Sequence, residues 1–148
     1  MMMSKEKFHE GLEGIVEDIQ KMGVLALDML TDAVKAFKEQ DKVLAEFVYA
    51  RKEQLDHYDR DIEERALRLL TLHQPMAGDM RTIASILKMD TYLNRIGRYG
   101  KAIAKDAIAL ADRPHLAKLV LIPQQAKLVR GRIEDALRAF AEDDLTYS

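Results

Sequence analysis

Residues 8–37 read FHEGLEGIVEDIQKMGVLALDMLTDAVKAF, and this stretch decides the fold. It contains no proline, and its apolar side chains recur at steps that alternate between four and three residues almost throughout. That spacing is the period of a seam between supercoiled helices. The seam consists of Phe8, Leu12, Ile15, Ile19, Met22, Ala26, Met29, Ala33 and Phe37. The stretch therefore predicts a long bundle helix over residues 5–39, with Ser4 as a partial N-cap.

A second helix is predicted over residues 42–73, with Asp41 as its N-cap. The pair Gln74-Pro75 should end it, because a residue before proline is pushed away from helical geometry. The predicted apolar stripe consists of Leu44, Phe47, Val48, Leu55, Tyr58, Ile62, Ala66, Leu69 and Leu70.

A third helix is predicted to run to about Ala111, with Asp79 either as its cap or in its first turn. Two glycines, Gly97 and Gly100, lie inside it. Because glycine destabilises a helix interior, its presence indicates close approach of a neighbouring helix. The predicted apolar positions are Ile83, Ile86, Leu87, Leu93, Ile96, Ile103, Ala107 and Leu110.

The pattern breaks at Asp112-Arg113-Pro114, and the residues up to Pro123 fit either a short helix or an extended link. Proline is tolerated in a first helical turn, so a fourth helix is predicted over residues 123–142. Its apolar face consists of Ala126, Val129, Ile133, Leu137 and Phe140. The predicted fold is all-α. It consists of an antiparallel three-helix bundle over residues 1–112, followed by a linker and one further helix over residues 113–148.

The chain contains an internal repeat. Residues 31–41 read TDAVKAFKEQD, and residues 134–144 read EDALRAFAEDD, with six of eleven positions identical. The repeat predicts that the fourth helix begins a second, truncated bundle. Its apolar face must be covered either by its own bundle or by a second chain, and we therefore expect a homodimer.

Composition excludes several classes of protein. The 148 residues carry 23 basic and 25 acidic side chains and no cysteine, which excludes disulfides and zinc–thiolate sites. The interspersed charges argue against nucleic-acid binding. No apolar run approaches the roughly 20 residues that span a bilayer, and the polar start lacks a signal peptide, so we expect a cytoplasmic protein. The sequence contains no glycine-rich phosphate-binding loop and no nucleophile motif, and it therefore does not indicate an enzyme.

The segment 55–81 reads LDHYDRDIEERALRLLTLHQPMAGDMR, followed by IASILKM at 83–89 and LNRIG at 93–97. In order and spacing, residues 50–104 resemble the PhoU family of phosphate-signalling proteins, which typically consist of two tandem three-helix bundles. The resemblance implies a regulator of phosphate uptake and phosphate-starvation signalling. It implies protein–protein contact with a phosphate ABC transporter ATPase or a sensor histidine kinase at the cytoplasmic face of the membrane. Arg81 and Arg95 match family positions, where they fit either partner contact or surface ion pairs.

The resemblance also implies a metal site, because some PhoU-like proteins bind iron or zinc clusters through Glu/Asp-x-x-x-Asp motifs. Where relatives read Glu-Arg-Ile-Gly-Asp, this chain has Asn94 and Arg98 at the two ligand positions. Three nearby carboxylates remain, at Asp59, Glu63 and Asp90. They predict either a residual divalent-metal site or an ion-pair cluster in which Arg98 replaces the metal. The missing ligands favour the ion pairs and no cofactor. A metal-binding helical bundle and a generic helical adaptor are the alternative functions.

Overall fold

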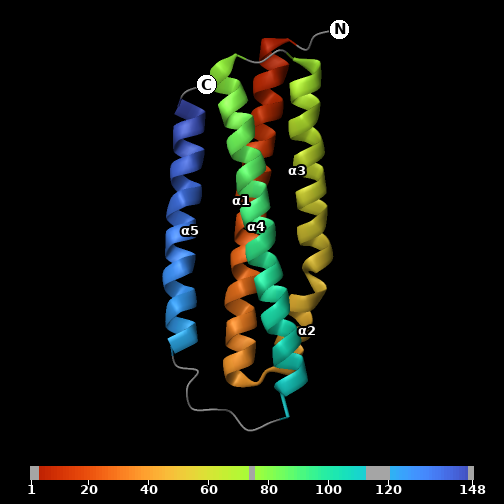
Figure 1. The fold of residues 1–148 in the computed structure, drawn as a ribbon, viewed down its shortest axis with the longest axis vertical. Helices are drawn as coiled ribbons and strands as arrows, with labels where there is room; N and C mark the ends of the chain where they lie inside the picture. Colours follow the sequence, from red (N-terminus) through yellow and green to blue (C-terminus); the bar gives the residue numbers. More distant parts are fainter. Residues whose placement is uncertain (1–3, 74–75, 113–120, 147–148) are drawn as a thin grey trace.

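The computed structural model describes residues 4–73, 76–112 and 121–146, and every regular element in these ranges is an α-helix. The elements are α1 (Lys5–Glu39), α2 (Lys42–Ala50), α3 (Lys52–Leu72), α4 (Ala77–Leu110) and α5 (Leu121–Thr146). Figure 1 shows the chain running along α1, back through α2 and α3, along α4 and back through α5. The predicted all-α bundle with an additional helix is confirmed. None of the described helices is long and apolar enough to cross a membrane.

Helix α1 has the predicted bounds because both of its ends are capped. The Ser4 hydroxyl accepts a hydrogen bond from the Lys7 backbone N–H at 3.2 Å. At the other end, Gln40 adopts a left-handed conformation with φ of 55°, and the Asp41 N–H donates to the Ala36 carbonyl at 2.9 Å. The Asp41 carboxylate then accepts from the Leu44 N–H at 3.0 Å, which begins α2 as predicted.

The predicted seam of α1 forms the centre of the core, and all of its members are buried except Phe37, which is partly buried. Helix α4 packs along α1 at very short range. A Cβ atom added at Gly100 would lie 2.8 Å from the Met29 carbonyl carbon and 2.9 Å from the Leu30 nitrogen. One added at Gly97 would clash with a methyl group of Leu55. Both glycines therefore serve the close helix packing predicted for them.

The predicted continuous helix over residues 42–73 is wrong, because it divides at Arg51 into α2 and α3. The Arg51 N–H bonds to the Val48 carbonyl three residues back, at 3.0 Å, which tightens one turn. The Arg51 guanidinium forms an ion pair with Asp32 of α1 at 3.0 Å and lies 4.3 Å from the centre of the Phe47 ring. Phe47 lies at the surface beside this guanidinium, with 58% of the residue exposed, although the apolar pattern placed it in the core.

Smaller corrections concern the ends of α4 and α5. Helix α4 begins at Ala77 after Met76, so Asp79 lies in its first turn and is not the cap. Helix α5 extends from Leu121 to Thr146, beyond both predicted ends, and Pro123 lies in its first turn. Leu110, the last residue of α4, and Val129 of α5 are 39% and 42% exposed, although the apolar pattern placed both on packed faces. The Gln74-Pro75 stop and residues 113–120 of the predicted linker lie outside the described residues.

Helix α5 packs against α1, antiparallel to it (Figure 1). Leu137 is 4% exposed, and a Cβ added at Gly23 of α1 would lie 2.5 Å from one of its methyl groups. Gln20 donates to the Leu137 carbonyl at 2.9 Å. Arg130 pairs with Asp28 of α1 at 2.9 Å. Leu137 is thus the most deeply buried of the described α5 side chains, and Ile133, Phe140 and Ala141 pack beside it against the core.

We expect Leu137→Ala to release α5 while leaving the bundle of α1 to α4 folded. Truncating a buried leucine costs about 2–5 kcal/mol, and this cost falls on the α1–α5 contact. Amide hydrogen exchange measures the result, as faster exchange confined to α5. The matched control is Leu128→Ala in the same helix, where the residue is 65% exposed and exchange should stay unchanged. Equal effects of the two changes would contradict this docking.

Candidate functional site

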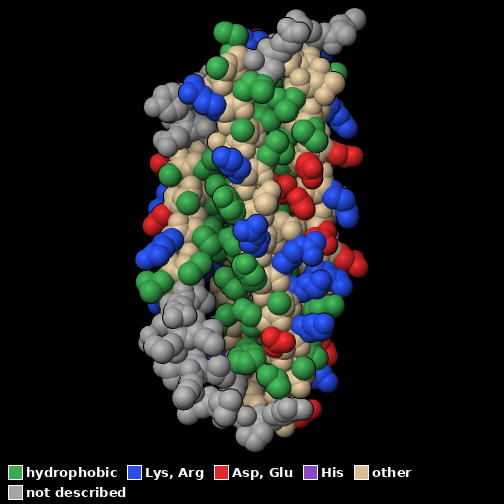
Figure 2. All heavy atoms as spheres, in the orientation of Figure 1, with side chains coloured by type: hydrophobic (Ala, Val, Ile, Leu, Met, Phe, Trp, Pro, Cys, Tyr) green, Lys and Arg blue, Asp and Glu red, His purple; other side chains and the backbone are tan. Residues whose placement is uncertain are grey.

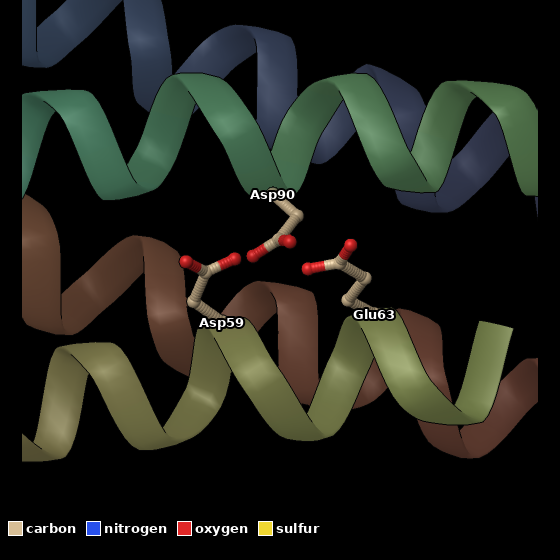
Figure 3. Close-up of side chains that lie close together, drawn as sticks. All are labelled: Asp59, Glu63 and Asp90. Carbon is tan, nitrogen blue, oxygen red and sulfur yellow. The ribbon is translucent and has the colours of Figure 1, made fainter. Parts of the chain in front are cut away.

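The three predicted carboxylates converge at the boundary between α3 and α4. Asp59 and Glu63 lie one turn apart on α3 and point toward α4, and Asp90 points back from α4 between them (Figure 3). One carboxylate oxygen from each residue lies within 4.8 Å of the others. The i, i+4 spacing on α3 places both of its side chains on one face, as the sequence predicted.

Asp90 is the distinctive member of this acidic cluster. It is 3% exposed, and its Oδ1 atom has no hydrogen-bond partner in the described part of the chain. Burial raises the pKa of Asp90 to about 8, and a hydrogen bond with Asp59 and the charges of Asp59 and Glu63 act in the same direction. A buried polar atom without a partner is costly, so the site is arranged for a proton or a cation.

The alternative in which Arg98 neutralises this cluster is wrong. Arg98 pairs with Asp56 at 3.1 Å, and its Nε donates to the Asn94 side-chain oxygen at 2.8 Å. Asp56 lies one turn before Asp59 on α3, and the antiparallel course of α4 brings Arg98 opposite Asp56. The Arg98 guanidinium therefore neutralises Asp56, one turn away along the bundle. It does not supply a cation to the acidic cluster.

The acidic cluster lines an open cavity of about 340 Å³, together with Leu67, Leu87, Thr91 and Asn94. Three carboxylates and a nearby amide offer oxygen ligands, which suit hard divalent cations. The unpartnered Asp90 oxygen fits such an ion. The oxygen-rich lining of the described cavity is therefore chemically suited to binding a cation.

We expect Asp90 to make folding stability depend on pH when no metal is added. Its pKa lies near 8 in the folded chain and 3.8 in the reference state, so the folded state binds more protons between these values. Stability from this group is therefore present at low pH and is lost as the pH rises through about 8. In thermal melts, the melting temperature of Asp90→Asn should increase relative to that of wild type as the pH rises. Asp106→Asn, at an exposed position on α4, should run parallel to wild type.

Arg81 and Arg95 lie apart from the acidic cluster, on the outer face of α4. Both are exposed, and neither forms an ion pair with a described residue, so the surface ion pairs considered for them are absent there. They are 14 residues apart, which is nearly four turns and places them on one side of the helix. We define the outer α4 face as Arg81, Lys88, Tyr92, Arg95 and Tyr99.

The two tyrosines of the outer α4 face were not identified from the sequence. Tyr92 and Tyr99 are 55% and 58% exposed. Figure 2 looks onto α4, where hydrophobic and basic side chains are interspersed. Tyr92 and Tyr99 are seven residues apart, and helical geometry places them on the same side of α4 as Arg81 and Arg95. This spacing is the sequence feature from which they could have been identified.

Comparison with known proteins gives one family. Residues 19–107 match the PhoU domain. The chain is 35% identical to a phosphate-specific transport system accessory protein PhoU homolog of Caulobacter vibrioides, over 95% of this chain and 61% of the relative. It is 34% identical to the homolog of Aquifex aeolicus, over 93% of this chain and 62% of the relative. The crystal structure of PhoU from Pseudomonas aeruginosa is similar with a TM-score of 0.87 and 32% identity, over 91% of this chain and 65% of that one. The chain thus spans about three fifths of these relatives' length.

Proposed function

This chain belongs to the PhoU family, and from that premise we propose that it regulates phosphate uptake by contacting a phosphate transport system. Its similar relatives are named accessory proteins of phosphate-specific transport. The partner is the ATPase of a phosphate ABC transporter or a sensor histidine kinase, which the chain meets in the cytoplasm. The proposed role is regulatory and not catalytic, and it is supported by the naming of similar relatives as transport accessory proteins.

The outer α4 face is the observation that supports a contact role. Tyrosine and arginine are the side chains most enriched at the energetic centres of protein interfaces. Here two exposed tyrosines alternate along α4 with basic side chains that no described carboxylate neutralises. Such a face fits an acidic partner surface, because opposite charges speed association and fix the register of the complex.

We expect Arg81→Glu combined with Arg95→Glu to weaken partner binding by at least about tenfold, because reversing two charges sets like charges against an acidic surface. Isothermal titration with the purified transporter ATPase, and separately with the kinase's cytoplasmic region, measures the affinity. The matched control is Lys35→Glu with Lys127→Glu, which changes the net charge equally at exposed positions on other helices. Absence of binding to both partners at high micromolar concentration would count against the proposed function. Equal loss in both double variants would count against the outer α4 face.

Metal binding is a second proposed property, favoured by the unpartnered Asp90 oxygen. Asp59, Glu63 and Asp90 would supply carboxylate ligands to iron, zinc or another divalent ion. The ion would tie α3 to α4 and thereby stiffen the bundle beneath the outer α4 face.

We also propose that the chain forms a homodimer, and the internal repeat supports this. Ala33 and Ala36 of α1 are fully buried, whereas their counterparts in α5, Ala136 and Ala139, are exposed. A face that matches a core-forming face and is left open is suited to a second chain. Light scattering at high micromolar concentration tests the proposal, and a monomeric mass would contradict it.

A further inference from the structure

A second charged cluster lies below the acidic cluster, where α2 and α3 meet α4. Its centre is the half-buried ring of Tyr49 on α2. The Lys52 ammonium lies 4.4 Å from the centre of that ring, and its Nζ donates to the Tyr49 hydroxyl at 3.4 Å. The Lys101 ammonium of α4 lies 5.6 Å from the same ring centre. Side chains from two sides of a helix junction therefore converge on one phenol.

A third lysine extends the cluster along α4. Lys105 lies one turn after Lys101 on the same face of the helix. Its charge reaches Tyr49, because Lys52, Lys101 and Lys105 together lower the pKa of the phenol. We define the basic cluster as Tyr49, Lys52, Lys101 and Lys105.

The positive charges of the basic cluster are not neutralised by ion pairs with described residues. No carboxylate in the described ranges forms an ion pair with any of its three lysines, although Arg51, Arg65, Arg98 and Arg130 are each paired. Lys52 and Lys101 are only partly exposed, so water screens their mutual repulsion less than it would at an open surface. An anion among the three ammonium groups would relieve this repulsion.

We propose that the basic cluster binds the phosphate group of a small oxyanion or of a lipid headgroup. Inorganic phosphate carries more than one negative charge at neutral pH and has several acceptor oxygens, which matches three ammonium donors. A lipid headgroup phosphate carries one charge, but an anionic membrane presents several such groups side by side to the three lysines. A single carboxylate offers one charge and two oxygens and would leave part of the cluster uncompensated. The Tyr49 hydroxyl accepts from Lys52, so its own O–H remains able to donate to the anion.

This proposal rests on local charge and geometry and does not depend on the proposed regulatory role. Its test has two arms that distinguish the source of the phosphate group. In the first, inorganic phosphate is titrated into the isotope-labelled chain, and the ring resonances of Tyr49 are followed by NMR. In the second, vesicles of phosphatidylglycerol or of neutral phosphatidylcholine are sedimented with the chain.

We expect binding in at least one arm, and binding to phosphatidylglycerol but not phosphatidylcholine if the source is a lipid. Replacing Lys52, Lys101 and Lys105 with glutamine should weaken binding by at least about tenfold, since a lysine near an anionic surface is worth about fivefold in affinity. Tyr49→Phe keeps a ring, whose phenylalanine resonances are followed in place of those of Tyr49, and removes the donor, so it should weaken phosphate binding by about fivefold.

The matched control replaces Lys5, Lys35 and Lys127 with glutamine, which lowers the net charge equally at exposed positions on other parts of the bundle. Binding that survives this control and is lost in the cluster variant supports the proposal. No binding in either arm would overturn it, and so would binding that both triple variants weaken equally. Circular dichroism of each variant confirms that the helices remain folded.

Discussion

Gly100→Ala should lower the free energy of unfolding by about 2 kcal/mol, although alanine is the better helix former. Overpacking a core typically costs about 1–3 kcal/mol, because side chains leave their preferred rotamers and the backbone shifts. At Gly100 the new methyl group would meet the backbone of Met29 and Leu30 at 2.8–2.9 Å, and a helix backbone cannot rotate away. We therefore take about 3 kcal/mol, less about 1 kcal/mol gained in helix propensity. Denaturant unfolding followed by circular dichroism measures the difference.

Two other glycines provide the controls for this change. Gly131→Ala on α5 has no atom within 4 Å of the new methyl group and should be neutral or stabilising by up to about 1 kcal/mol. Gly97→Ala meets the buried side chain of Leu55 and not a backbone, so its effect should lie between those of the other two. If Gly100→Ala were as stable as Gly131→Ala, the close approach of α1 and α4 at Met29 would be wrong.

Divalent metal binding should depend on Asp90 more than on any other carboxylate of the acidic cluster. Its pKa near 8 means that Asp90 is mostly protonated at neutral pH, so a binding cation must displace about one proton. Titration calorimetry with Mn²⁺ and with Zn²⁺ in buffers of different ionisation enthalpy measures that proton. A metal present at a hundred times its dissociation constant would also stabilise the fold by about 2.7 kcal/mol.

Asp90→Asn removes a ligand charge and should weaken binding at least about tenfold, with loss of the proton release. Asp106→Asn is the matched control, because this exposed aspartate lies on α4 outside the acidic cluster. A bound metal with no proton release and equal affinity in both variants would place the ion elsewhere in the chain. Less than about a tenth of an equivalent bound to wild type would remove the proposed metal site.

The sequence predicts the elements whose signals are local. The seam from Phe8 to Ala33 and the caps at Ser4 and Asp41 define α1 and the start of α2, because spacing and capping act over a few residues. The pairing of Asp59 with Glu63 follows from one helical turn, and Asp90 was identified with them. These features can be predicted without knowing the register of one helix against another.

The features that were missed depend on contacts between helices. The break at Arg51 has no proline or glycine to mark it and coincides with an ion pair to Asp32 on α1. The partner of Arg98 depends on the register of α3 against α4, because a shift of one turn exchanges Asp56 for Asp59. The basic cluster combines residues about 50 positions apart, and only the fold brings Lys101 to Tyr49.

We propose that the outer α4 face, and not the acidic cluster, recognises the partner. One calorimetric comparison tests it most directly: the affinity for the phosphate transporter ATPase of wild type, of the Arg81→Glu and Arg95→Glu double variant, and of Asp90→Asn. We predict that the double variant loses at least about tenfold in affinity while Asp90→Asn binds within about twofold of wild type. Full binding by the double variant, or a loss confined to Asp90→Asn, would contradict the claim.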